Sequence, residues 1–184
     1  MTELSLHILD IVQNSLKAGA ALTEIEITAS SNDDFLSILI RDNGQGMTGE
    51  QLARVEDPFY TTRTTRKIGL GVPLFKQAAE QTGGSFSIVS EKGKGTELRA
   101  RFVLSSIDRM PMGDLAGTVR MLIAGNPNTD FHFSYEVDGR QFTLDTREMR
   151  GILGDIPLDH PDALRFVRTY LEENLREANG DLLL

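Results

Sequence analysis

The segment "RDNGQGM", residues 41–47, places a carboxylate beside two glycines that bracket one polar residue. It directly follows "FLSILI", residues 35–40, an apolar run that is typical of a strand. A strand that ends in an acid and a glycine-rich loop suits either a tight turn or a binding site. The rest of the chain has to decide between these two interpretations.

The composition is that of an ordinary globular protein. The chain has 184 residues, of which 40% are hydrophobic and 25% charged, so it allows one domain or a domain with a small appendage. Its net charge of -8 disfavours binding to nucleic acid or to anionic lipid and would repel a bare polyphosphate. A nucleotide is therefore expected to arrive with a divalent cation and to meet local positive charge.

Cysteine usage and the first residues bear on the location of the protein. The chain has no cysteine, which excludes disulfides, thiolate metal sites and thiol nucleophiles. We find neither a signal-peptide pattern nor an apolar run close to the roughly 18 residues that span a bilayer. We therefore expect a cytoplasmic protein that binds neither nucleic acid nor membrane.

Apolar spacing predicts alternating helices and strands in the first part of the chain. Helices are predicted over residues 4–20, 48–56 and 72–84, and strands over residues 23–30, 35–42, 85–91 and 96–104. After residue 105 the pattern predicts a loop, a helix over 115–125, a hairpin over 130–146 that turns at Asp138-Gly139, a short helix over 147–153 and an amphipathic helix over 160–178.

The first predicted helix carries a polar stripe. At 3.6 residues per turn, Asp10, Asn14 and Lys17 fall within an arc of about 60°. One interpretation is a solvated helix face. The other is a site, because a carboxylate can orient a nucleophile, an amide oxygen suits Mg²⁺ and an ammonium suits phosphate. His7 lies on the same side, where a packing or capping role is more common than a catalytic one.

Four motifs resemble, in the same order, those of the GHKL superfamily of ATP-binding domains, which histidine kinases, MutL, gyrase-type topoisomerases and certain chaperones share. "LDIVQNSLKAGA" resembles the N box and "RDNGQGM" the first glycine box. "DPFYTTR" resembles the aromatic box before the lid, and "GLGVPLFKQAAEQTGGSFSIVSEKGKGTEL" the second glycine box through the final G-x-G-T box. Each motif alone is weak, but their common order over residues 4–104 favours the binding site over the tight turn.

The resemblance implies a fold and a domain organisation. We expect an α+β protein, a two-layer α/β sandwich in which a mixed, largely antiparallel sheet carries helices on one face. Residues 1–104 are expected to form the ATP-binding domain. Residues 105–184 are expected to form a small α/β extension, a helical and hairpin subdomain that either packs on the core or docks a partner.

The resemblance also assigns residues to the adenine end of an ATP site. Asp42 is expected to accept a hydrogen bond from the adenine amino group, as a carboxylate suits an N–H donor. Gly44 and Gly46 would let backbone approach the ring, and Met47 would pack on the base. Thr96 is expected to share a water with the acid; otherwise it is a threonine that begins a strand.

A second set of residues is expected at the phosphates. The turn Gly69-Leu70-Gly71 would offer backbone N–H groups at the start of a helix, whose dipole favours anions. Arg63 and Lys67 would supply local positive charge. On the polar stripe, Asn14 is expected to hold Mg²⁺, Lys17 to meet phosphate and Asp10 to act as the catalytic group.

Two departures from the family pattern bear on activity. Asp10 stands where ATP-hydrolysing relatives carry Glu, and its side chain is one methylene shorter, so nucleotide binding and turnover are separate expectations. Lys17 is typical of the kinase branch, whereas the surrounding "NSLKAGA" is closer to MutL, and the segment between Phe59 and Gly69 predicts a short lid. Because few residues precede the first motif, we expect action on another protein rather than on an attached histidine helix.

The expected function is therefore Mg-dependent ATP binding with transfer of the γ-phosphoryl group to a protein partner in regulation. A nucleotide-responsive switch or chaperone-like ATPase with slow hydrolysis is one alternative. An anti-sigma-like regulatory binding protein is another. The sequence leaves the partner and the oligomeric state open.

Overall fold

The computed structural model describes residues 2–55 and 71–184. Its elements before residue 105 are α1 (Leu4–Lys17), β1 (Leu22–Ser30), β2 (Phe35–Asp42), α2 (Gly49–Arg54), α3 (Gly71–Gln81), β3 (Ser85–Glu91) and β4 (Gly95–Val103). The later elements are α4 (Leu115–Gly125), β5 (Asp130–Val137), β6 (Arg140–Asp145), α5 (Thr146–Leu153) and α6 (Pro161–Asn179). The predicted helices and strands are thus confirmed, with small shifts at their ends.

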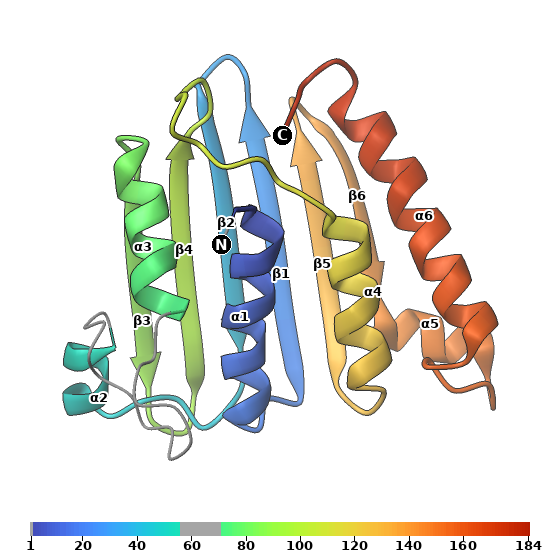
Figure 1. The fold of residues 1–184 in the computed structure, drawn as a ribbon. Coiled ribbons are helices and arrows are strands. Elements are labelled where there is room, and N and C mark those ends of the chain that lie inside the picture. The colour runs from blue at the N-terminus through green and yellow to red at the C-terminus, as the bar shows by residue number, and fades with distance from the viewer. Residues whose placement is uncertain (1, 56–70) are drawn as a thin grey trace.

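The strands form one six-stranded sheet in the order β3-β4-β2-β1-β5-β6. Neighbouring strands are antiparallel except β1 and β5, which run parallel. Helices α1, α3 and α4 lie side by side on one face of this sheet (Figure 1). The predicted α+β class, with a mixed, largely antiparallel sheet and helices on one face, is confirmed.

Glycine and polar residues in the sequence explain where α1 ends and where α2 begins. Helix α1 ends before the predicted residue 20, because Gly19 adopts a φ of 73°. Helix α2 begins after Thr48, whose hydroxyl accepts from the amide of Gln51 while the Gln51 side chain accepts from the amide of Thr48. The short helix that follows the glycine-rich loop is therefore capped by its own sequence.

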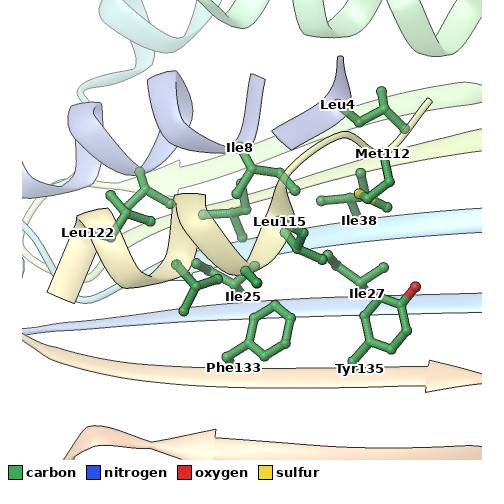
Figure 2. Packing of buried hydrophobic residues seen from close by; sticks show 14 of the residues in the cluster. Leu4, Ile8, Ile25, Ile27, Ile38, Met112, Leu115, Leu122, Phe133 and Tyr135 are labelled. Atoms are coloured by element: carbon green, nitrogen blue, oxygen red, sulfur yellow. The ribbon is translucent and has the colours of Figure 1, made fainter. Parts of the chain in front are cut away.

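The core lies between the sheet and the helices. Leu4 and Ile8 of α1, Leu115 of α4 and the strand residues Ile25 and Phe133 all lie between the helices and the sheet (Figure 2). All five side chains are 3% exposed or less, and they belong to one buried cluster. Apolar residues on both sides of position 105 therefore share a continuous core.

The segments after residue 105 join the sheet through β5. In the parallel pairing Ile25 lies opposite Phe133, and the chain then turns at Asp138 and Gly139, which have φ angles of 50° and 80°. Positive φ at both central residues is what a two-residue hairpin turn requires, so the predicted turn is confirmed. The division of the chain into domains at residues 104 and 105 stays a prediction.

The segment between β4 and α4 crosses in front of β2 and β1 (Figure 1) and holds the start of α1. The amide of Leu4 donates to Pro111 O at 3.0 Å, and that of Ser5 donates to Met112 O at 2.9 Å. Two of the N–H groups that the first turn of a helix leaves without a partner are satisfied in this way.

In the described part of the chain, every helix is too short or too polar to traverse a lipid bilayer. The cytoplasmic location stays a prediction.

His7 is a packing residue of the core. It is 2% exposed, and its ring stacks on that of Phe75 of α3 with a centroid separation of 5.4 Å. Neither ring nitrogen has a hydrogen-bond partner among the described residues. Burial, which disfavours the charged imidazolium, lowers the pKa of His7 to about 4.

This burial predicts a pH-dependent loss of stability. Because the pKa of His7 is near 4 in the folded chain and 6.5 as the ordinary value, the unfolded chain binds the proton first as the pH falls. From pH 7 to pH 4.5, His7 should therefore lower the free energy of unfolding by about 2–3 kcal/mol. Urea denaturation of the wild type and of His7→Phe at both pH values measures the contribution of His7 to this change in the free energy of unfolding. The contributions of the other titratable groups are the same in both proteins and cancel in the comparison. Parallel pH profiles would contradict the assignment.

Candidate functional site

A cavity of about 290 Å³ opens at the end of the sheet where α1 ends and α3 begins. That end of the sheet is at the bottom of Figure 1, on the side of α2. Seven of the residues singled out in the sequence line it, namely Asn14, Lys17, Asp42, Gly46, Met47, Gly71 and Thr96. The fold therefore brings residues from three of the four sequence motifs to one cavity, and the aromatic box lies outside the described residues.

Asp42, the last residue of β2, has a buried carboxylate at this cavity. The residue is 8% exposed. Its Oδ1 accepts from the amide of Gly44 at 2.9 Å, and its Oδ2 accepts from the hydroxyl of Ser15 at 2.7 Å. A buried carboxylate needs such donors, because an unpaired charge out of water is costly. The remaining lone pairs of the Asp42 carboxylate are hydrogen-bond acceptors, so a ligand group that contacts them has to be a donor.

Two hydroxyl residues continue the polar end of the sheet beside Asp42. Thr96 of β4 lies opposite Asp42 of β2, and Ser90 of β3 lies opposite Thr96. The Ser90 and Thr96 hydroxyl oxygens are 2.8 Å apart. The Ser90 oxygen also accepts from the amide of Met47 at 2.9 Å, which ties the glycine-rich loop to the edge of the sheet.

Sequence reasoning missed Ser15 and Ser90. The signal for Ser15 is its place in the N-box motif directly after Asn14, on the buried side of α1. Ser90 can be recognised only once the strand register is known, because the register places Asp42, Thr96 and Ser90 in one row across the sheet. Neither serine could be assigned a role from local spacing alone.

The loop from 43 to 47 is wedged between two neighbouring turns. The amide of Gln45 donates to Ala18 O at 2.9 Å on one side, and the amide of Gly93 donates to Gln45 O at 2.7 Å on the other. The side-chain oxygen of Asn43 accepts from the backbone amides of residues 21 and 22, both at 2.9 Å. The loop that follows Asp42 is therefore held on both sides by backbone hydrogen bonds.

The two neighbouring turns leave little room for side chains at the glycines of this loop. Gly46 has a φ of 63°, and a Cβ there would lie 2.0 Å from the carbonyl oxygen of Glu91. A Cβ on Gly44 would lie 2.9 Å from the carbonyl oxygen of Ala18. The sequence alone suggests that these glycines allow a base to approach closely, whereas the neighbouring backbone already requires Gly46.

The first turn of α3 meets the polar stripe of α1. A Cβ on Gly71 would lie 2.3 Å from Oδ2 of Asp10 and 3.7 Å from Nδ2 of Asn14. Asp10 thus lies against the start of α3 without lining the cavity, whereas Asn14 and Lys17 line it. The N-terminal end of a helix and a lysine both favour a negatively charged ligand here.

Four predicted residues lie outside the described residues, namely Arg63, Lys67, Gly69 and Leu70. Within residues 2–55 and 71–184, no three His, Cys, Asp or Glu side chains converge as a metal site. The donors that fit Mg²⁺ are the amide oxygen of Asn14 and the carboxylate of Asp10, because Mg²⁺ prefers hard oxygens and completes its shell with water and phosphate.

Apolar side chains form the walls of the cavity. They come from α1, from α3 and from three strands, and they are Ile11, Ile40, Val72, Ile88 and Leu98. A cavity with apolar walls and a few fixed polar groups at its ends is typical of a small-molecule site. The sequence predicts these residues only as parts of helices and strands.

Comparison with known proteins gives the class. Residues 2–106 match the family described as histidine kinase-, DNA gyrase B-, and HSP90-like ATPase. Because this match covers more than half of the chain, the protein belongs to that family. The resemblance stated from the four motifs is confirmed.

Among curated proteins, the chain is similar to sensor kinases. It is 27% identical over 106 residues to sensor histidine kinase ZraS of Escherichia coli (strain K12), covering 58% of this chain and 23% of that protein. It is 37% identical over 92 residues to sensor protein SrrB of Staphylococcus aureus (strain NCTC 8325 / PS 47), covering 47% of this chain and 16% of that protein. The chain therefore spans less than a quarter of the length of these relatives.

Among solved structures, the chain has the fold of an Aquifex aeolicus MutL ATPase domain complexed with ADP. The TM-score is 0.50 at 13% identity, and the match covers 98% of each chain. The N terminal domain of a DNA repair protein matches with a TM-score of 0.51 at 16% identity, over 79% of this chain and 53% of that one. At these identities the likeness shows the fold alone.

The wedge around the glycine-rich loop generates a stability prediction. Gly46→Ala places a Cβ 2.0 Å from the Glu91 carbonyl oxygen at a positive φ, so it should lower the free energy of unfolding by more than about 2 kcal/mol. Gly93→Ala is the matched control, because Gly93 has a φ of 85° with no atom within 4 Å of a new Cβ. Chemical denaturation compares the two. Equal losses would mean that conformational strain alone, rather than the contact with Glu91, requires Gly46.

Proposed function

We propose that the protein binds Mg-ATP in this cavity and transfers the γ-phosphoryl group to a protein partner. The observation that carries the proposal is that one cavity combines a buried acid with groups that favour phosphate. The acid is Asp42, and the other groups are Asn14, Lys17 and the start of α3 at Gly71. Membership of an ATPase family supports ATP as the ligand.

At the base end, Asp42 would accept from the exocyclic amino group of adenine. Its carboxylate is already oriented by the Ser15 hydroxyl and the Gly44 amide, so no reorganisation is needed on binding. Met47 would pack on the base, and Thr96 would hold a water shared with Asp42. The backbone of Gly44 and Gly46 would pass close to the ring.

At the phosphate end, the amide oxygen of Asn14 would hold Mg²⁺ together with phosphate oxygens. Lys17 and the N-terminal turn of α3 would stabilise the negative charge of the phosphates. The further phosphate-binding residues of this proposal are Arg63, Lys67, Gly69, Leu70 and Gly71. Charge neutralisation and positioning account for most of the catalysis of phosphoryl transfer, so these groups are the ones the reaction requires.

Asp10 would orient the attacking group. Its carboxylate lies against Gly71, next to Asn14, and so close to where the terminal phosphates would be held. A carboxylate at this position can accept a proton from an acceptor hydroxyl or imidazole of a partner protein. The same carboxylate can orient water, which makes a slowly hydrolysing, nucleotide-responsive switch the second candidate function.

ATP labelled on the γ-phosphate separates these candidates. Transfer of label to a protein from the native host supports the kinase, and release only as free phosphate supports the switch. Asp10→Asn should abolish either reaction while calorimetry shows ATP affinity within about threefold of the wild type, because the variant removes a proton acceptor and keeps the shape. Unchanged turnover would remove Asp10 from the mechanism. ATP-dependent capture of a partner without any turnover would instead favour the anti-sigma-like alternative.

Asn14 generates a separate prediction on the metal. Asn14→Ala should weaken ATP binding at least about tenfold in Mg²⁺ and much less in EDTA, because the lost oxygen contacts the metal rather than the nucleotide. Titration calorimetry with and without Mg²⁺ measures both affinities. Gln13→Ala is the matched control, since Gln13 is the neighbouring amide on α1 and does not line the cavity. An equal loss in EDTA would exclude the ligand role.

A further inference from the structure

Ser90 makes three hydrogen bonds at the end of β3, next to the cavity. Its hydroxyl oxygen lies 2.9 Å from the amide nitrogen of Met47, 2.9 Å from the carbonyl oxygen of Gly95 and 2.8 Å from the hydroxyl oxygen of Thr96. A serine hydroxyl has one proton to donate and two lone pairs to accept with. Three partners therefore use its full capacity.

The chemistry of two partners fixes the direction of the third bond. An amide N–H can only donate, so Ser90 accepts from Met47. A carbonyl oxygen can only accept, so the single proton of Ser90 goes to Gly95. Ser90 therefore has no proton left for Thr96. The proton between these two hydroxyl oxygens has to come from Thr96, which donates to Ser90.

Thr96 is thereby left with lone pairs only on the side of the cavity. Asp42, the other polar residue that the strands contribute to the cavity lining, is likewise an acceptor when ionised. The proton of Ser15, which could otherwise point into the cavity, is directed at Asp42 Oδ2 at 2.7 Å. The polar end of the sheet therefore presents hydrogen-bond acceptors to a ligand.

We propose that Ser90 is a positioning residue that determines base selectivity, because it turns the Thr96 proton away from the cavity and leaves an acceptor surface. This inference rests on the proposed nucleotide function and names which base that site accepts. The 6-amino group of adenine is a donor that such an acceptor surface can pair with, and a purine without a donor at this position leaves the acceptors unpaired. Unpaired buried polar groups of this kind discriminate strongly between ligands.

The test compares ATP with the triphosphate of purine riboside, which lacks the 6-amino group and keeps N1 as a hydrogen-bond acceptor. By titration calorimetry in Mg²⁺, the wild type should bind ATP at least about tenfold more tightly than this analogue. Ser90→Ala frees the Thr96 proton to turn into the cavity and should narrow this ratio by about fivefold to tenfold, whatever the loss in absolute affinity. A purely structural role of Ser90 would weaken both nucleotides equally.

Ser87→Ala is the matched control. Ser87 lies on the same strand three residues earlier, and its side chain is exposed rather than turned towards Thr96. In Ser87→Ala, the ratio of the affinities for the two nucleotides should equal that of the wild type. A ratio in Ser90→Ala that also stays at the wild-type value would overturn the inference.

Thr96→Val tests the same polarity without altering Ser90. Removing an acceptor should weaken ATP binding several-fold and leave binding of the purine riboside analogue nearly unchanged. The double variant with Ser90→Ala should show the same affinity ratio as Thr96→Val alone, because no hydroxyl remains to turn. A loss for the analogue that equals or exceeds the loss for ATP in Thr96→Val would mean that Thr96 does not accept from the 6-amino end of the base, and would refute the proposal.

The failures of this inference and of the proposed function are distinguishable. A folded wild-type protein that binds neither nucleotide overturns both. A wild-type protein that prefers ATP, with ratios insensitive to Ser90 and Thr96, overturns only the role of Ser90. Thermal denaturation of each variant establishes that the proteins compared are folded.

Discussion

The burial of one carboxylate constrains the whole functional end of the sheet. Asp42 ends a strand inside the protein, where an ionised group persists only if donors surround it. One donor, Ser15, comes from α1, and the other is the amide of Gly44 in the loop that follows. The helix, the strand and the loop are therefore fixed relative to one another by the same two oxygens. A loop that left this position would leave the charge with one donor fewer in a low dielectric.

The local signals in the sequence were sufficient for the elements and insufficient for their long-range arrangement. Alternation and helical spacing predicted the strands and helices, and Asp138-Gly139 predicted the hairpin turn because both residues accept positive φ. The parallel pairing of β5 with β1 could not be predicted, since the register between Ile25 and Phe133 depends on packing between segments far apart in the chain. Core continuity across residue 105 follows from that pairing.

The same limit applies to the site. Asp42 and Asn14 could be singled out because an acid beside glycines and a polar stripe on a helix have local signatures. Ser90 and Ser15 could not, because their roles arise from partners across the sheet and from a helix packed above it. The reason for Gly46 was also incomplete, since the carbonyl oxygen that excludes its side chain belongs to β3, which begins far along the chain. Motifs thus identify the groups that meet a ligand better than those that orient them.

Helix α1 connects these observations to the residues after 105. It supplies Ser15, which donates to the buried acid, and Asn14, which lies beside the start of α3, so a shift of α1 would alter both surroundings at once. On the sheet it lies between α3 and α4 (Figure 1), and its first turn is hydrogen-bonded to the segment that leads into α4. Helix α4 packs on α1 and strand β5 pairs with β1, so both support the cavity from behind without lining it.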